Sequence, residues 1–239
     1  MSELSPETRA RLEGISTATL TTLLFKRGLR QQFMQNVQPL ARYPKSMVGE
    51  AFTLRYMPAR EDLNPLDVFQ DPKHPQRHAV ETCPAGAVFV MDSRKDARAA
   101  SAGAILVTRL MKRGVAGVVT DGGFRDSGEI AALGIPAYHQ RPSAPTNLTL
   151  HQAIDINVPI GCGDAPVFPG DIIVGDADGV VVLPRGIADE LADTAWEMTA
   201  FEDFVMDEVQ GGASIRGLYP ATDPKTLERF AQWRKANGR

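Results

Sequence analysis

Arg125 and Asp126 are adjacent residues of the two types best suited to binding a small acid and a metal ion. They directly follow the apolar run VAGVV and the glycine turn DGGF. A guanidinium can hold a carboxylate through a two-pronged hydrogen bond, and a neighbouring carboxylate can bind a hard divalent cation. The alternative is an ion pair within a loop. The glycines before the pair favour a site, because they let another group approach the backbone closely.

The histidines are weaker candidates. His74 and His78 have the four-residue spacing of some zinc sites, but Pro75 follows the first directly and no third ligand is near in sequence. We therefore expect these two histidines to lie in a solvated loop. His139 and His151 stand alone, which is typical of structural, hydrogen-bonded histidines.

Cysteines and the remaining acids suggest no further site. Cys83 and Cys162 lack ligand spacing, so we expect two reduced, buried thiols. The GCG sequence around Cys162 lacks the third glycine of a dinucleotide-binding turn, and no phosphate-binding loop is present. Several aspartates fall in turns, where such side chains commonly bond their own backbone. These are Asp164, Asp171, Asp176 and Asp178.

The stretch from Gly103 to Asp126 contains the elements that must position the charged pair. Apolar residues recur near helical spacing from Ile105 to Met111, with cations opposite and Gly114 just beyond, which predicts an amphipathic helix. The short apolar run 115–119 predicts a strand inside a sheet. Sites in α/β sheets are built at such strand ends.

The flanking sequence predicts alternating helices and strands, followed by a β-rich half and late helices. Helices are expected after Ser5, over Ser16–Arg27, at His78–Thr82, from Ser127 to Gly134, and over Gly186–Val209 and Pro224–Lys235. Strands are expected over Val48–Tyr56, Ala87–Met91, Ile135–His139, Ile156–Ile160, Asp171–Val174 and Val180–Leu183. Four prolines between Pro58 and Gln76 predict a long loop of functional character.

Composition limits the classes of partner. The 239 residues are 43% apolar, enough for a sizeable core in one domain with terminal helical additions. The net charge is -3 and charges of both signs are mixed, so no basic face for nucleic acid is expected. No apolar run approaches the roughly 20 residues that span a bilayer. We expect a cytoplasmic protein without membrane contact.

Three co-linear segments resemble the RraA-like family, which includes the 4-hydroxy-4-methyl-2-oxoglutarate (HMG/CHA) aldolases and the regulators of ribonuclease E. They are RGVAGVVTDGGFRD, NVPIGCGDAPVFPGD and IIVGDADGVVVLP. The resemblance covers Ile15 to Glu208 and implies an α/β fold of the β/β/α swivelling type. It divides the chain into an RraA-like domain (1–213) and a C-terminal helical extension (214–239). It also implies a homotrimer or homohexamer with sites between subunits.

The resemblance to the aldolases implies roles for specific residues. Arg125 would bind the carboxylate of the pyruvyl unit, and Asp126 would anchor Mg²⁺ or Mn²⁺ largely through water. The family glycine corresponds to Gly103, and the helix amides of Ile105 and Leu106 would hold the same carboxylate, as helix N-termini do.

This chain departs from the aldolase pattern at one position. Aldolase members carry an acid just after the glycine, 21 positions before the arginine, and here that position is Ala104. Alanine can neither hold a metal-bound water nor move a proton. Either another acid substitutes, with Asp92, Asp96 or Asp121 as candidates, or the protein catalyses a narrower range of reactions than the aldolases.

Two functions follow as hypotheses. The first is a metal-dependent lyase on small 2-oxo acids, by retro-aldol cleavage to pyruvate or by decarboxylation of an oxaloacetate-like substrate. The intact Arg125-Asp126 pair favours it. The second is a non-catalytic binding protein of the ribonuclease-regulator type, which Ala104 favours. A methyltransferase is excluded because no glycine-rich nucleotide loop follows a first strand.

Overall fold

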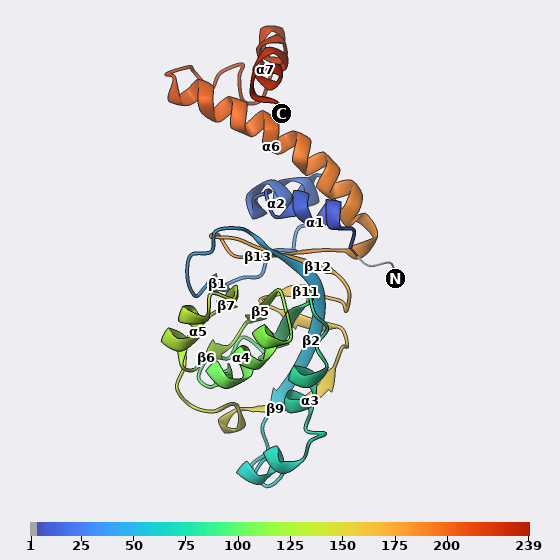
Figure 1. The fold of residues 1–239 in the computed structure, drawn as a ribbon, viewed down its shortest axis with the longest axis vertical. Coiled ribbons are helices and arrows are strands. Elements are labelled where there is room, and N and C mark those ends of the chain that lie inside the picture. Colours follow the sequence, from blue (N-terminus) through green and yellow to red (C-terminus); the bar gives the residue numbers. More distant parts are fainter. Residues whose placement is uncertain (1–3) are drawn as a thin grey trace.

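The computed structural model describes residues 4–239. The helices are α1 (Pro6–Leu12), α2 (Thr17–Lys26), α3 (Pro75–Thr82), α4 (Ala104–Lys112), α5 (Ser127–Leu133), α6 (Ala188–Gln210) and α7 (Pro224–Asn237). Short 3-10 turns are η1 (Leu66–Gln70), η2 (Asn147–Thr149) and η3 (Arg185–Ile187). Figure 1 shows α3, α4 and α5 along the parallel strands of the sheet. Helices α1 and α2 and the start of α6 lie at the end of the sheet where β12 and β13 are drawn.

Most strands of the described chain join one sheet of eight, in the order β1-β7-β5-β3-β2-β12-β13, with β9 also paired to β2. The strands are β1 (Gln38–Pro39), β2 (Met47–Pro58), β3 (Val88–Asp92), β5 (Gly117–Thr120), β7 (Ala137–His139), β9 (His151–Ile156), β12 (Ile172–Gly175) and β13 (Val180–Leu183). Strands β2, β3, β5 and β7 run parallel, so their carboxyl ends meet at one edge.

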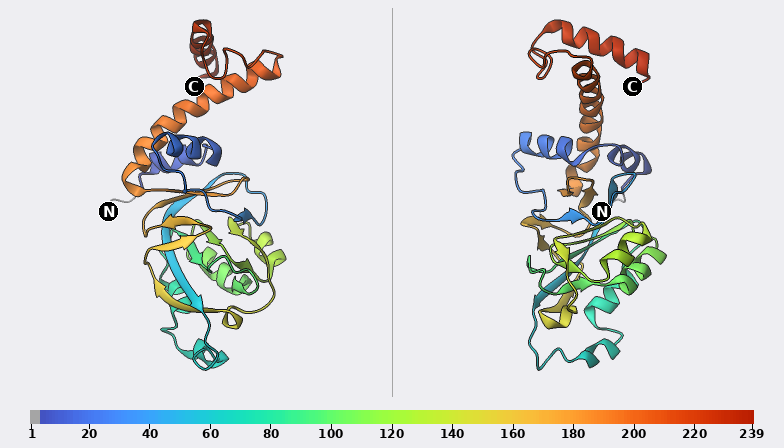
Figure 2. Two further views of the ribbon diagram at one scale, coloured as in Figure 1. Left: turned by 180° about the vertical axis from the view of Figure 1, so that it is seen from behind. Right: turned by 90° about the vertical axis from the view of Figure 1, so that its left-hand side faces the viewer.

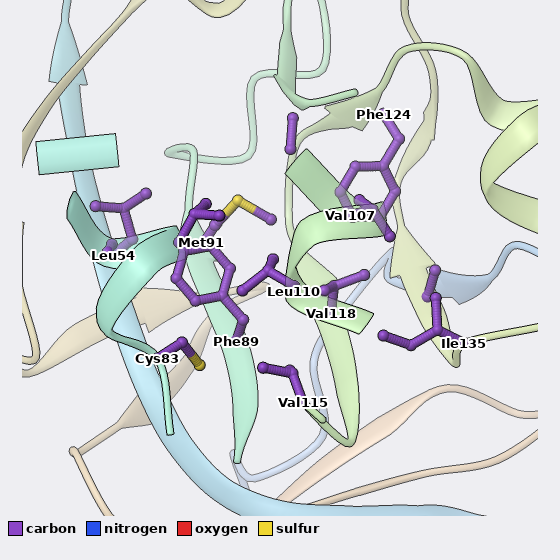
Figure 3. Packing of buried hydrophobic residues seen from close by; sticks show 14 of the residues in the cluster. Leu54, Cys83, Phe89, Met91, Val107, Leu110, Val115, Val118, Phe124 and Ile135 are labelled. Atoms are coloured by element: carbon purple, nitrogen blue, oxygen red, sulfur yellow. The ribbon is translucent and has the colours of Figure 1, made fainter. Parts of the chain in front are cut away.

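Helices α3, α4 and α5 cover one face of the parallel strands. Val107 and Leu110 of α4 pack with Phe89 and Val118 of the sheet, and Figure 3 shows these side chains interlocking with Met91 and its neighbours. The opposite face carries Val90 and Tyr138, which pack against the hairpin formed by β10 (Ile160–Cys162) and β11 (Ala165–Val167). Helices, sheet and hairpin form the β/β/α layers expected from the sequence.

A second, three-stranded sheet lies beyond the carboxyl ends of the parallel strands. It consists of β4 (Ala100–Ala102), β6 (Gly123–Phe124) and β8 (Arg141–Pro142), all parallel. Strand β4 leads into α4 and β6 leads toward α5. The small sheet therefore fixes where these two helices begin.

The C-terminal helices form an arm. The first half of α6 packs on α1 and α2 through Leu191 and Ala195, and the second half extends away from the sheet to α7 (Figures 1 and 2). Rings of Phe201, Phe204 and Phe230 join the two helices. These extra helices agree with the sequence, and the domain division at residue 213 stays a prediction. No helix within residues 4–239 is long and apolar enough to cross a membrane.

Helix starts agree with their sequence signals in two places. Ser5 caps α1 by accepting from the Thr8 amide, and Ser16 caps α2 by accepting from the Thr19 amide. The expected capping role of Ser127 is wrong: it is the first residue of α5, and its hydroxyl donates to Phe124 O at 3.1 Å. Asp126 occupies the capping position instead.

The strand expected over Ile156–Ile160 is also wrong. Strand β9 ends at Ile156 and β10 begins at Ile160. Between them Asn157 has φ 56°, a left-handed conformation that ends an extended strand, and its amide donates to Thr53 O at 2.7 Å. The apolar residues there pack on different layers instead of lying along a single strand.

Candidate active site

The small sheet places Gly103 and Arg125 side by side. Ala102 and Phe124 are paired in neighbouring parallel strands, and the Arg125 amide donates to Ala102 O at 3.1 Å. The residues that follow the two strand ends, Gly103 on one and Arg125-Asp126 on the other, therefore lie together. This strand pairing makes Gly103 a neighbour of Arg125 and Asp126, which follow it by 22 and 23 positions in the sequence.

Gly103 must be a glycine because the charged pair packs against it. A Cβ atom there would lie 2.7 Å from Arg125 Cγ and 2.7 Å from Asp126 Oδ2, closer than such contacts occur. Gly122 also allows close packing, because a Cβ atom there would lie 2.6 Å from Ser93 Cβ. Gly122 and Gly123 therefore serve close packing, and neither has positive φ.

Asp126 is held in an unusual backbone conformation. Its φ of 56° and ψ of 41° lie in the left-handed region, which non-glycine residues enter at a cost of about 1 kcal/mol or more. Its Oδ2 accepts from the Ala104 amide at 3.2 Å, so the carboxylate joins the start of α4 to the start of α5. Oδ1 makes no hydrogen bond within the described chain and lies 3.6 Å from Arg125 Nε. One carboxylate oxygen is therefore available to a ligand.

A small open cleft of about 220 Å³ surrounds these residues, and we call it the Arg125 cleft. It is below the roughly 300–1,000 Å³ of drug-sized pockets, which suits a small acid. Asp126 is the one carboxylate lining it, and Arg77 and Arg125 supply two guanidinium groups. The lining residues are Phe69, Gln76, Arg77, Ala100, Ala102, Gly103, Ile105, Leu106, Arg125, Asp126, Thr146 and Asn147.

The start of α4 contributes backbone donors to the cleft. Within the described chain the Ile105 amide makes no hydrogen bond, whereas the Leu106 amide already donates to Gly103 O at 3.1 Å. The Ala104 amide is taken by Asp126. Of the two amides expected to hold a carboxylate, Ile105 therefore has the freer donor.

A larger hollow of about 880 Å³ lies on the other side of the molecule, between the start of α2 and the segment after β1. Its charged residues include Glu13 and Lys45, which pair with each other at 3.3 Å, and Asp176, which accepts from Thr17. Glu13 and Lys45 therefore satisfy each other, and Asp176 is satisfied by Thr17. The Arg125 cleft is therefore the better candidate despite its smaller size.

Comparison with known proteins decides the family. The family model described as "RraA-like: Aldolase/RraA" matches residues 17–182, well over half of the chain. The chain belongs to the RraA-like family. The match includes Gly103, Arg125 and Asp126, and the recognition made from the three sequence segments is confirmed.

Named relatives include both branches of the RraA-like family. A protein of Halalkalibacterium halodurans named as a candidate 4-hydroxy-4-methyl-2-oxoglutarate aldolase is 36% identical over 118 residues, 49% of this chain and 56% of its own. The crystal structure of Streptomyces coelicolor RraAS2, titled an unusual member of the RNase ES inhibitor RraA family, is 27% identical with a TM-score of 0.75, covering 85% of this chain and 98% of that one. The chain spans about half the length of the curated relatives it matches.

A further solved structure supports the RraA-like fold alone. An uncharacterized protein from Pseudomonas syringae superimposes with a TM-score of 0.76 at 21% identity, covering 92% of this chain and all of that one. The agreement extends beyond the matched family segment and includes most of the sheet and helices described above.

None of the three acids considered from the sequence takes the place of the family acid that Ala104 replaces. None of Asp92, Asp96 and Asp121 lines the Arg125 cleft. Asp96 is held by Arg98, which keeps the pKa of that carboxyl low, at about 2. Burial raises the pKa of Asp92, whose carboxylate accepts from the Arg94 amide. Within the described chain the cleft therefore lacks the family's acid.

Asp121 is a structural carboxylate. It is 1% exposed and accepts from the amides of Ser93, Lys95 and Gly163 at 2.7, 3.1 and 3.2 Å. Burial raises its pKa to about 6 against the effect of these amides, which lower it. The carboxylate thus ties the loops after β3 and β10 to the end of β5.

We expect Asp121→Ala to destabilise the RraA-like fold by about 2–4 kcal/mol, because three amide donors lose their acceptor. Urea denaturation at pH 7.5 would measure it. Asp62→Ala is the matched control, since Asp62 is exposed and paired with Arg60 at the surface, and should change stability by less than about 1 kcal/mol. Equal stability of the two variants would contradict the structural role.

The histidine and cysteine predictions have mixed outcomes. His74 is buried at the start of α3 with its ring against Phe69, so the solvated-loop prediction is wrong for it, while His78 is exposed. His151 is structural as expected, with its ring bonded to Arg94 and to Asp96 O. Both cysteines are free, buried thiols as expected.

Several cleft residues were not found from the sequence, and three of them carry polar side chains that matter below. Gln76 and Arg77 come from the first turn of α3, and Asn147 begins η2. The proline-rich loop 58–76 was the one signal, because it leads directly into α3. Gln76 donates to Tyr56 Oη and Ser101 O at 3.0 and 2.8 Å, which anchors this side of the cleft to the strands.

The donor set at the cleft suits one kind of cation. No three His, Cys, Asp or Glu side chains within residues 4–239 are arranged to hold a metal ion among themselves. Mg²⁺ commonly keeps several waters and takes only one or two protein carboxylates. Asp126 lines the cleft and has no hydrogen bond at Oδ1, so it fits a largely hydrated Mg²⁺ or Mn²⁺ and does not fit a cation that needs a full protein cage.

Proposed function

We propose that this protein is a divalent-metal-dependent lyase acting on small 2-oxo acids, by retro-aldol cleavage to pyruvate, by oxaloacetate-type decarboxylation, or by both. The observation that supports it most is the arrangement of Arg125 and Asp126 against Gly103 at the start of α4. A carboxylate clamp, a free carboxylate oxygen and a helix N-terminus converge there on one small cleft. The candidate-aldolase relatives agree with this class of activity.

Both reactions leave an electron pair on the same pyruvyl unit. In aldol cleavage the C3–C4 bond breaks and the hydroxyl at C4 becomes a carbonyl; in decarboxylation the bond to the departing carboxylate breaks and CO₂ leaves. Negative charge then develops on the C2 oxygen. A divalent cation held by Asp126 would supply positive charge beside that oxygen.

The residues of the chain supply the orientation. Arg125 can hold the C1 carboxylate through its paired N–H groups, and the Ile105 amide can donate to the same group with the favourable end of the α4 dipole behind it. Asp126, whose carboxylate is tied to the Ala104 amide, would hold a cation through its free oxygen. Such contacts would orient the C2 carbonyl toward the stabilising charge.

A panel assay tests this function. Chelator-treated protein would be given 4-hydroxy-2-oxo acids and oxaloacetate with and without Mg²⁺ or Mn²⁺, and pyruvate formation would be followed. Metal-dependent release of pyruvate above the rate with free metal alone supports a lyase. Absence of release from every acid of the panel would contradict it.

A non-catalytic binding role is the second candidate, and Ala104 favours it. The RraA branch is represented by RraAS2, whose title names an RNase ES inhibitor family. A protein without any lyase activity but with an intact fold would fit this alternative. The close packing of Arg125 and Asp126 on Gly103 favours the lyase, because a binding surface alone does not need that close approach.

The assembly of subunits belongs to the same proposal. The Arg125 cleft is open, and the α6–α7 arm extends away from its own sheet (Figure 2). A homotrimer or homohexamer would close the cleft with a neighbouring chain. No nucleic acid is required for the proposed chemistry.

We expect Ala104→Asp to raise aldol cleavage of a 4-hydroxy-2-oxo acid at least tenfold. Cleavage needs a base for the C4 hydroxyl proton, and acid/base help is worth about 10²–10⁴-fold, whereas decarboxylation needs mainly the electron sink. Ala104 is half-buried between the cleft residues Gly103 and Ile105, and its amide donates to Asp126. Steady-state rates with this acid and with oxaloacetate, for both proteins at saturating Mg²⁺, would measure the difference.

Ala104→Asn is the matched control, because it has nearly the same shape without a titratable group. Brisk cleavage by the natural protein, with no gain in Ala104→Asp, would mean that another group supplies the base.

A further inference from the structure

Arg77 is a second guanidinium in the Arg125 cleft with no ion partner. Within residues 4–239 it makes no hydrogen bond or ion pair, and its guanidinium carbon lies over the Phe69 ring, 4.3 Å from the ring centroid. Other arginines near this end of the molecule are paired: Arg109 with Glu81, and Arg60 with Asp62. An unpaired guanidinium facing a cleft is available to an anionic ligand.

The surroundings of Arg77 fix its orientation. The Phe69 ring on η1 lies under the guanidinium carbon, and His74 contacts the same ring edge-on with centroids 5.1 Å apart. His74 is buried at the start of α3, two residues before Gln76, so the platform is continuous with the helix that carries Arg77. Stacking on one face leaves the N–H edge of the guanidinium free to bind a planar carboxylate.

Asn147 adds a second donor to the Arg125 cleft. Its side chain is 6% exposed, and Nδ2 is buried without a hydrogen-bond partner within the described chain. Buried polar groups are normally paired, so an unpaired amide lining a cleft suggests a ligand that accepts. Asn147 and Arg77 reach the cleft from η2 and α3, elements outside the strand ends that carry Arg125 and Asp126.

The charges of the cleft also call for more than one anionic group. Arg77 and Arg125 contribute two positive charges and Asp126 one negative charge. A 2-oxo acid with one carboxylate balances Arg125, and Asp126 offsets half the charge of a divalent cation. The charge on Arg77 and half the charge of the cation then stay unbalanced. A second carboxylate on the substrate would balance the charge on Arg77, and the negative charge that develops on the C2 oxygen would balance the rest of the cation's charge.

We infer that Arg77, supported by Phe69 and assisted by Asn147, binds a second carboxylate of the substrate and thereby selects 2-oxo acids with two carboxylates over those with one. The assignment of the first carboxylate to Arg125 rests on the proposed function. The selection by Arg77 does not depend on turnover, because binding alone expresses it.

The test uses two unreactive acids that differ only in the distal group: 2-oxoglutarate, and 2-oxopentanoate, which has a methyl in place of the second carboxylate. Calorimetry with the full chain and saturating Mg²⁺ should give about tenfold tighter binding of 2-oxoglutarate, the order expected of a charged hydrogen bond at a partly exposed site. Arg77→Gln should remove this preference and leave 2-oxopentanoate within about twofold.

Two further variants sharpen the outcome. Arg77→Lys should restore part of the preference, because it keeps the charge and loses the planar fork. Arg109→Gln removes an exposed arginine outside the cleft and should leave both affinities unchanged. Equal binding of the two acids by the natural protein, binding of neither, or equal weakening of both in Arg77→Gln would overturn the inference. A preference for 2-oxoglutarate in a protein that cleaves no acid would sustain it and contradict the lyase.

Discussion

Asp126→Asn should remove metal binding and reduce metal-dependent turnover to the rate of free metal ions. The amide oxygen lacks the charge that makes a carboxylate a good ligand for Mg²⁺ or Mn²⁺. The variant should still fold, because asparagine also tolerates the left-handed conformation seen at φ 56°, and its side-chain oxygen can still accept from the Ala104 amide. A loss of metal binding and turnover without a loss of stability would identify Asp126 as a metal ligand.

Calorimetric titration with Mn²⁺ and thermal unfolding of the same samples would measure both properties. We expect no measurable heat of metal binding and a stability change below about 1 kcal/mol, since Asp126 is exposed at the surface. The exposed acid Asp62, changed to asparagine, is the control and should retain full metal affinity. Unchanged Mn²⁺ affinity in Asp126→Asn would remove Asp126 from the metal site.

Arg125→Lys should lower kcat/KM for a 2-oxo acid by about 10–100-fold, because an ammonium cannot replace a two-pronged guanidinium on a carboxylate. The Arg125 side chain is 47% exposed and its nearest charged partner, Asp126 Oδ1, lies 3.6 Å away, so the guanidinium is not committed to a structural ion pair. The loss should therefore appear in substrate use and leave folding unchanged.

The same change at Arg109, paired with Glu81 outside the cleft, is the matched control and should leave kcat/KM unchanged. Steady-state kinetics at saturating Mg²⁺ would compare the three proteins. Near-normal kcat/KM in Arg125→Lys would mean that another group holds the carboxylate.

Much of the fold was predictable because its signals are local. Ser5 and Ser16 cap helices, and the apolar periodicity after Gly103 gives α4 with its buried face on the sheet. The apolar runs gave the buried strands, although β5 begins at Gly117, two residues later than the apolar pattern suggested. Long segments with strong periodicity carry their structure in their own sequence.

The small sheet was missed because its strands are two or three residues long. Such segments show no period, and β4, β6 and β8 exist only through pairing between residues about 20 apart in the chain. That pairing is what brings Gly103 to Arg125. The candidate residues Arg125 and Asp126 were therefore found from their types after a strand end, and Gly103 from the family pattern, but none of them from the contacts that position it.

Arg77 and Asn147 escaped prediction for a related reason. Each belongs to a different element, and neither lies in a motif; only the folded chain brings them to one cleft. Asp121 was a candidate acid because it is close to Arg125 in sequence. In the fold its carboxylate is buried and accepts from three backbone amides. Proximity in sequence to a strand end does not distinguish a side chain that faces the cleft from one that faces inward.

Decarboxylation of oxaloacetate by the natural protein and by Asp126→Asn, at equal Mn²⁺, tests the central claim most directly. Free Mn²⁺ sets the background rate, which is subtracted from both. We expect the natural protein to exceed this background, to lose the excess when a chelator is added, and to show no excess in Asp126→Asn. A natural protein that stays at the background rate, or an excess that survives both the chelator and the substitution, would contradict a metal-dependent lyase at Arg125 and Asp126.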